Sequence, residues 1–153
     1  YDNLTAYENL DFFGKLYAIP QVEREARINA LLDQVGLKKR ATSLVRTFSR
    51  GMQQRLSIAR ALLQNPEVLF FDEPYTGLDQ DASVLLDGLL RDAHQDNRTI
   101  IMTTHLLQRV TSLANRAIIL SRGKIVYDDD ITQLSPLELT EIYTQATGVA
   151  STR

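Results

Sequence analysis

The chain has 153 residues and a net charge of −2, with 44% hydrophobic and 24% charged residues, a balance that is typical of a soluble globular domain and excludes a disordered chain. The charge gives no indication of binding to nucleic acid or to an anionic membrane. The absence of cysteine excludes disulfides and thiolate metal sites, and no apolar run approaches the roughly 20 residues that cross a bilayer. These 153 residues show no pattern of a signal peptide or a lipidation site, so neither is expected within them.

The N-terminal part is predicted to be helical. Thr5 and Glu8 have the spacing of a capping box, and apolar residues then recur at helical spacing up to Pro20. A second helix is expected over residues 22–35, ending at Gly36. Its outer face is expected to be solvated and carries Glu23, Arg24, Glu25 and Arg27. Its inner stripe is predicted to be Ala26, Ile28, Leu31, Leu32 and Val35.

A basic connector, residues 37–47, separates this helix from the next. A nucleic-acid patch is the alternative, but no aromatic side chain is interleaved to stack on bases, so a solvated connector is favoured. A third helix opens at Ser49–Gly51 and ends at Asn65 and Pro66. Its buried side is predicted to be Met52, Leu56, Ala59, Leu62 and Leu63.

Four consecutive apolar residues, 68–71, lead directly into Asp72, Glu73 and Pro74. A run without alternation predicts a central strand of a parallel sheet with both faces buried, and proline prevents its continuation. Ligands of open α/β sheets bind beyond the carboxyl ends of the strands, so the two acids are expected to face a metal-bound nucleotide. The alternative is a strand that ends in a solvated acidic turn.

Helices and strands alternate in the remainder, which predicts crossover connections and a mostly parallel sheet. The expected elements are a turn at 77–79, helices at 82–93, 106–113 and 137–146, and strands at 99–102, 117–120 and 125–127. A hairpin turn is predicted at 121–124. Asp128–Asp130 are expected to form a solvated turn rather than a metal site, because three consecutive residues of a regular strand cannot all face one ion and the spacing of a calcium-binding loop is absent. We expect a helical subdomain over 1–64 and part of an α/β core over 65–153.

Three segments in chain order resemble the ATP-binding subunit of an ABC transporter. They are Ser49–Arg55, then Val68–Pro74 with Gly77–Asp79, and finally Thr104-His105. The resemblance covers essentially the whole chain, and Phe48–Leu62 is similar to subunits of haem exporters and ABC-2-type exporters. It implies an α/β fold: a partial P-loop NTPase (RecA-like) core with a mostly parallel sheet and an α-helical subdomain.

The resemblance also implies roles for the matched residues. The signature residues Ser49, Arg50, Gly51 and Met52 would reach the γ-phosphate of ATP held by the other subunit of a dimer, at a helix N-terminus that favours an anion. The alternative for Ser49 is an ordinary helix cap. Arg50 and Met52 depart from the family's glycine and glutamine, so any role of that glutamine is not carried over.

The remaining matches concern catalysis. Asp72 would hold Mg²⁺, and Glu73 would act as the general base on the attacking water. Asp79 matches the aspartate of the D-loop, which passes between the subunits. His105 resembles the switch histidine that bonds to the γ-phosphate, and its alternative is a histidine in solvent at a strand end.

A phosphate-binding loop, G-x-x-x-x-G-K-S/T, does not occur in the chain. Because the chain also begins at Tyr1, we expect it to be the C-terminal part of a subunit, inactive by itself. The strand that carries the loop would lie between two strands of this chain. Strand 68–71 is therefore expected to pair in parallel with strand 99–102, and strand 117–120 is not expected to pair with either.

The predicted function is an ATP-binding and ATP-hydrolysing subunit of an ABC exporter at the cytoplasmic face of the membrane, with ATP and Mg²⁺ as cofactors. Its expected partners are a second ATP-binding subunit and transmembrane permease subunits, whose coupling helix would dock near residues 5–45; no nucleic acid is expected. One alternative is a soluble ABC ATPase acting on DNA or ribosomes, although these 153 residues contain neither the coiled-coil insertions nor the tandem halves usual there. The other is a non-catalytic interaction fragment.

Overall fold

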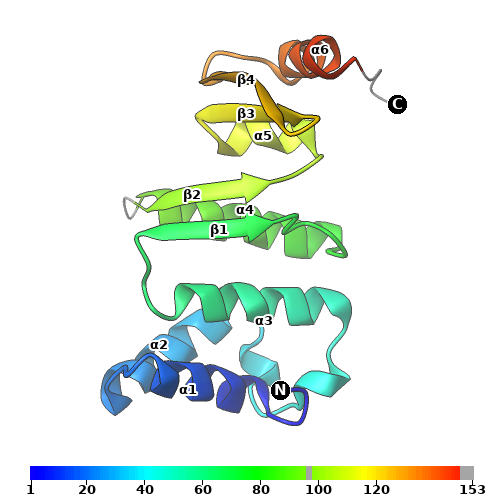
Figure 1. The fold of residues 1–153 in the computed structure, drawn as a ribbon. Coiled ribbons are helices and arrows are strands. Elements are labelled where there is room, and N and C mark those ends of the chain that lie inside the picture. The colour runs from blue at the N-terminus through cyan, green and yellow to red at the C-terminus, as the bar shows by residue number, and fades with distance from the viewer. Residues whose placement is uncertain (96–97, 149–153) are drawn as a thin grey trace. The chain divides into compact units, whose positions relative to one another are not determined.

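The computed structural model describes residues 1–95 and 98–148 and divides into two compact units, Tyr1–Thr103 and Thr104–Arg153. The first unit contains helices α1 to α4 and strands β1 and β2 (Figure 1). The second contains helices α5 and α6 and strands β3 and β4. The two-part division expected from the sequence, 1–64 and 65–153, stays a prediction.

Three helices form the N-terminal part of the first unit: α1 (Ala6–Leu16), α2 (Gln21–Gln34) and α3 (Arg50–Leu62). The predicted capping box begins α1, because Thr5 Oγ1 accepts from the Glu8 amide at 3.1 Å and the Thr5 amide donates to Glu8 Oε2 at 2.8 Å. The basic connector forms two short 3-10 turns, η1 (Lys38–Arg40) and η2 (Val45–Thr47). Gly36, with φ +66°, follows α2 in the left-handed conformation that ends helices.

The helices bury a common core that includes Leu10, Ile28, Leu32, Ile58 and Leu63. The predicted stripe of α2 is confirmed except for Ala26, which is exposed. At 3.6 residues per turn, a residue two positions before Ile28 lies about 200° around the helix from it, on the opposite face.

The solvated outer face predicted for α2 is wrong at Arg24, which is buried. Its Nε donates to Asp11 Oδ1 at 2.6 Å, and its Nη1 donates to the Ile19 carbonyl at 2.7 Å. The aliphatic part of its side chain crosses Gly14, where a Cβ would lie only 2.4 Å from Arg24 Cδ. Gly14 therefore makes room for a buried, paired arginine inside the helix packing.

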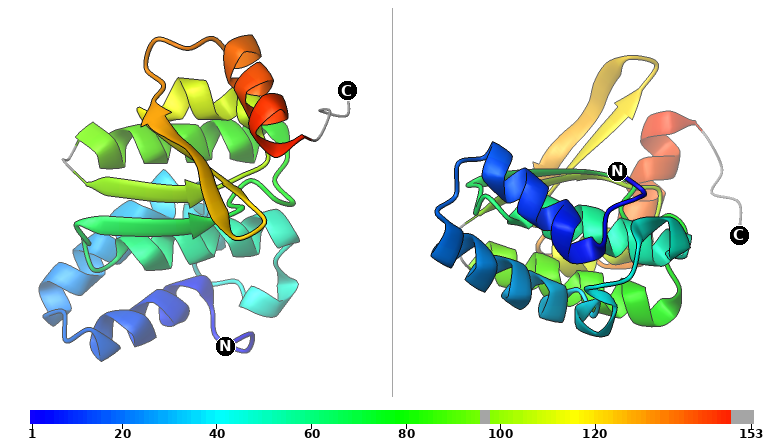
Figure 2. Two further views of the ribbon diagram at one scale, coloured as in Figure 1. Left: turned by 45° about the horizontal axis from the view of Figure 1, so that its top comes forward. Right: turned by 90° about the horizontal axis from the view of Figure 1, so that it is seen from below.

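Strands β1 (Val68–Asp72) and β2 (Thr99–Thr103) pair in parallel, as predicted, and the structure sets the register with Phe71 opposite Met102. The connection between them contains α4 (Gln80–Gln95), which runs along the strand pair (Figure 2) and contacts β2. A parallel pair joined through a helix brings the carboxyl ends of both strands to one edge.

The prediction that both faces of β1 are buried is wrong for this chain. Leu69 is 3% exposed, whereas Val68 and Phe70 are 45% and 73% exposed. Ile101 of β2 is likewise 47% exposed. Successive side chains of a strand point to opposite faces, and only one face of this pair is covered within the described part of the first unit.

The second unit consists of α5 (Leu107–Leu113), β3 (Arg116–Ser121), β4 (Lys124–Asp130) and α6 (Pro136–Thr147). The predicted hairpin is confirmed, with Arg122 and Gly123 both at positive φ, as the tightest hairpin turns require. Among the described residues, β3 forms a sheet with β4 alone, as expected of strand 117–120.

The solvated turn predicted at Asp128–Asp130 is wrong, because these residues continue β4 and pair with Arg116–Ile118. The Arg116 guanidinium binds both oxygens of Asp128, at 2.7 and 2.9 Å, and thereby offsets part of the negative charge of the strand. This hydrogen-bonded pair lowers the pKa of Asp128 below its ordinary value. None of the helices in the described ranges has both the length and the apolar content needed to cross a bilayer.

Candidate functional site

The carboxyl ends of β1 and β2 meet at Asp72 and Thr103, which are partners in the strand register. Asp72 is exposed, and its Oδ1 accepts a hydrogen bond from the Thr103 hydroxyl. The carboxylate is thereby fixed at the edge where nucleotides bind to open α/β sheets. Sequence reasoning did not single out Thr103; the signal that could have found it is a hydroxyl residue at the end of the neighbouring strand.

Glu73 turns the chain sharply out of the sheet. Its φ is +44°, a left-handed conformation that is uncommon for residues other than glycine and is often found at functional sites. The Glu73 amide donates both to the Thr103 carbonyl, at 3.1 Å, and to Thr103 Oγ1, at 3.2 Å. These two bonds to β2 hold the unusual backbone in place, so the side chain of Glu73 leaves the strand end in a defined direction.

The segment after Glu73 is a compact turn that leads into α4. The Thr76 amide donates to the Glu73 carbonyl and the Leu78 amide to the Tyr75 carbonyl, each at 3.1 Å. Tyr75 is buried and donates its hydroxyl to Asp87 of α4 at 2.6 Å. The turn is therefore tied to β2 at its start and to α4 further along.

Asp79 lies at the end of this turn and is exposed. Its Oδ1 accepts a hydrogen bond from the Ala82 amide at 2.8 Å, which is the geometry of a helix N-cap. Asp79 thus stabilises the start of α4 through one carboxylate oxygen. Its expected role between subunits stays a prediction.

The signature residues open α3, as predicted. Ser49 is the N-cap, and its Oγ accepts a hydrogen bond from the Met52 amide at 3.3 Å. Arg50 and Gly51 form the first turn of the helix, where backbone N–H groups lack intrahelical acceptors. The capping role of Ser49 is therefore present in the structure, and contact with a phosphate stays a prediction.

The structure brings the signature turn and the turn after β1 together within the first unit. A Cβ built at Gly51 would lie 3.5 Å from the Gly77 carbonyl oxygen, and Gln54 Nε2 donates to the Pro74 carbonyl at 3.3 Å. Ser49–Met52, Glu73 and Asp79 are thus held by contacting segments. Gln54 lies in the segment that carries the resemblance, but sequence reasoning assigned it no role of its own.

The residues can supply part of a magnesium site. Within residues 1–95 and 98–148, no group of three or more His, Cys, Asp or Glu side chains gathers where an ion could bind. Magnesium in phosphate-transferring sites is bound by one or two carboxylates, with waters and substrate phosphates completing its shell. One fixed carboxylate, Asp72, beside the Thr103 hydroxyl fits that donor set.

His105 belongs to the second unit, where it lies exposed in a bend between β2 and α5. The neighbouring Thr104 orders this bend, because its Oγ1 accepts a hydrogen bond from the Leu106 amide at 3.1 Å. The contact expected between His105 and a γ-phosphate stays a prediction.

Comparison with known proteins gives these residues a context. The family model described as "ABC transporter" matches residues 1–76. The chain is 35% identical over 141 residues to the ABC transporter ATP-binding protein NatA of Bacillus subtilis, covering 92% of this chain and 57% of that protein. It is 41% identical over 134 residues to a fluoroquinolones export ATP-binding protein of Mycobacterium tuberculosis, covering 88% of this chain and 43% of that protein.

A solved structure described as the ATP-binding subunit of an ABC transporter superposes with a TM-score of 0.86 at 28% identity. The superposition covers 95% of this chain and 63% of that one. The chain spans about half the length of each of the two relatives named above. Both its sequence and its α/β fold therefore place the chain in the family of ABC transporter ATP-binding proteins.

Proposed function

We propose that these residues supply the signature helix, the magnesium-binding aspartate and the catalytic glutamate of an ATP-hydrolysing subunit of an ABC exporter. The main support is the junction at the carboxyl ends of β1 and β2. There, Asp72 is fixed by Thr103, and Glu73 leaves the sheet through a left-handed backbone held by two hydrogen bonds. Side chains fixed in this way suit phosphoryl transfer, in which catalysis is mostly positioning and electrostatic stabilisation.

Each residue has one task in this proposal. Asp72 would hold Mg²⁺, which would supply positive charge to offset the negative charge of the ATP phosphates. Glu73 would accept a proton from the water that attacks the γ-phosphate, while the bond from that phosphorus to the bridging oxygen breaks and ADP leaves. His105 would donate a hydrogen bond to the same phosphate. Ser49 and the free N–H groups of the first turn of α3 bind the γ-phosphate of ATP held by a second subunit.

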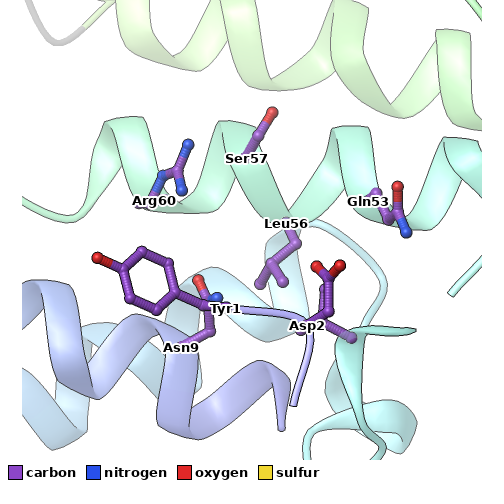
Figure 3. Close-up of a pocket in the computed structure, with 8 residues that line it drawn as sticks. Tyr1, Asp2, Asn9, Gln53, Leu56, Ser57 and Arg60 are labelled. Carbon is purple, nitrogen blue, oxygen red and sulfur yellow. The ribbon is translucent and has the colours of Figure 1, made fainter. Parts of the chain in front are cut away.

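The first unit also offers a place for the transmembrane partner. A pocket of about 160 Å³ opens between the N-terminal segment, α1 and α3 (Figure 3). It is lined by Tyr1, Asp2, Asn9, Val45, Gln53, Leu56, Ser57 and Arg60. Small-molecule sites usually occupy about 300–1,000 Å³, so this pocket is better suited to a side chain of a docked helix. We place the coupling helix of the permease here, near the expected residues 5–45.

Two finer points belong to the same proposal. The M. tuberculosis relative is named for fluoroquinolone export, which supports export as the direction of transport here. Through its permease the subunit would lie at the cytoplasmic face of the membrane. The 153 residues contain no phosphate-binding loop, so we expect no ATP turnover from this chain alone.

The proposal is tested with the full-length protein that contains these residues. We expect magnesium-dependent ATP turnover, and Glu73→Gln should lower kcat by about 100- to 10,000-fold while leaving ATP binding intact, because only the general base is removed. Glu67→Gln, an exposed glutamate just before β1, is the matched control and should hydrolyse ATP normally. Normal turnover in Glu73→Gln would refute the proposed mechanism.

A further inference from the structure

Arg50 packs its side chain against the turn that follows β1. Gly77 has a φ of +79°, and a Cβ at this position would lie 2.7 Å from Arg50 Cδ and 3.2 Å from Arg50 Cγ. The aliphatic stem of Arg50 therefore rests directly on the Gly77 backbone. Figure 1 shows the start of α3 and the turn after β1 at the same end of the first unit.

A second contact comes from the same face of α3. Gln54, four residues after Arg50, donates its side-chain amide to the Pro74 carbonyl at 3.3 Å. Residues four apart are neighbours on a helix surface, so Arg50 and Gln54 form one contact strip. This strip covers the turn at two points, Pro74 and Gly77.

The charge of Arg50 does not explain its position. The side chain is exposed, and within the described residues its guanidinium makes no hydrogen bond or ion pair. A positive charge in the first turn of a helix is unfavourable, because the helix dipole is positive at that end. The feature with an evident structural use is the stem, which fills the space above a glycine.

We propose that Arg50 is a positioning residue, whose stem clamps the turn 74–79 onto the first turn of α3. The clamp holds Ser49 and Asp79 in one fixed arrangement, so that the surface offered to a second subunit is formed before ATP arrives. This inference rests on the proposed function for its consequence in the dimer. The clamp itself is a property of the chain and can be measured without nucleotide.

Two variants of the full-length protein separate the stem from the charge. Arg50→Ala removes both, and Arg50→Met removes the charge but keeps an aliphatic stem; alanine and methionine both favour helix. Hydrogen exchange in the nucleotide-free protein reports on the amides of Thr76 and Leu78, which form the turn hydrogen bonds. We expect about tenfold faster exchange of these amides in Arg50→Ala, as for local opening, and little change in Arg50→Met.

The functional readout is the ATP-dependent dimer, measured by light scattering in a Glu73→Gln background. Arg50→Ala should raise the ATP concentration needed for dimer formation, and Arg50→Met should recover most of that loss. Arg46→Ala removes an exposed arginine from η2 and is the control for loss of charge alone. Equal behaviour of Arg50→Ala and Arg50→Met, or unchanged exchange in Arg50→Ala, overturns the clamp. If Glu73→Gln with native Arg50 forms no dimer with ATP, the proposed function fails, while the exchange rates still decide the clamp.

Discussion

At the scale of single residues, the unusual features of this chain are conformations and pairings that neighbours enforce. Glu73 adopts a left-handed backbone because two acceptors on Thr103 hold its amide. Arg24 is buried because Asp11 and the Ile19 carbonyl accept hydrogen bonds from its guanidinium, and Gly14 leaves space for its aliphatic stem. In both cases a feature that is unfavourable by itself, a left-handed backbone or a buried charge, is stabilised by contacts with other elements.

The pairing of Asp11 with Arg24 leads to a prediction about stability. Asp11→Ala leaves the buried guanidinium without its carboxylate and should lower the free energy of unfolding by about 2–3 kcal/mol at neutral pH. Asp33→Ala is the matched control: it removes the exposed pair with Lys38 and should change stability by less than about 0.5 kcal/mol. Urea denaturation of the full-length protein measures both.

The same pair has a defined pH dependence. Hydrogen bonds, first from Lys15 and then from Arg24, lower the pKa of Asp11 below its ordinary value. A carboxyl whose pKa is depressed in the folded state contributes its stability above the unfolded pKa, about 3.9, and loses it as the pH falls through the folded pKa. The difference between wild type and Asp11→Ala should therefore shrink below about pH 4. A difference that is constant down to pH 2 would contradict the pairing.

At the scale of elements, α3 and α4 both begin at the candidate site. Ser49 caps α3 and Asp79 caps α4, and the turn between β1 and α4 lies against the first turns of α3. The caps are local devices, whereas the contact between the turns depends on how the helices pack. The same polar side chains therefore serve helix stability and, in the proposed function, contact with a second subunit.

Substitution of Asp79 separates these two tasks. Asparagine caps helices about as well as aspartate, so Asp79→Asn should keep stability near wild type and lower ATP turnover through the loss of charge between subunits. Asp79→Ala should lower turnover and also the free energy of unfolding by about 1 kcal/mol. Thermal unfolding and steady-state ATPase assays on the full-length protein give the two readouts. Normal turnover in Asp79→Asn would mean that the cap is the only role of Asp79.

At the scale of the whole chain, apolar strand surface remains uncovered. Val68, Phe70 and Ile101 are exposed on β1 and β2, and Ile118, Leu120 and Ile125 on β3 and β4. Exposed apolar faces and unpaired strand edges promote association with other chains. We therefore expect the 153-residue chain, produced alone, to self-associate.

This expectation can be tested on the strand face itself. Phe70→Lys should reduce the association measured by sedimentation velocity, because it replaces an apolar side chain on the exposed strand face with a charged one. Phe70 is 73% exposed, so the substitution removes little packing within the chain itself. Val84→Lys replaces another exposed apolar residue, in α4 and 62% exposed, and should leave association unchanged. Association that responds equally to both substitutions would exclude the strand face as its cause.

The sequence by itself determined the features that depend on near neighbours in the chain. The capping box at Thr5 and the start of α3 at Ser49 were predicted and are confirmed, and β1 was predicted to end at Phe71 and ends one residue later, at Asp72. The parallel pairing of β1 with β2, which was expected from the order of elements and from the family resemblance, is also confirmed. Caps, turns and apolar spacing act over a few residues, and a crossover helix leaves parallel pairing as the simplest arrangement.

Only the tertiary structure decided the burial of Arg24, the exposure of Phe70, the strand conformation of Asp128–Asp130 and the contact of Arg50 with Gly77. Each depends on residues that are distant in the chain. Gly14 makes room for Arg24 and Gly77 for Arg50, Arg116 pairs with Asp128, and no described part of the first unit covers Phe70. The hydrophobic pattern predicts which side chains can be buried. A side chain is actually buried only where another element packs against it.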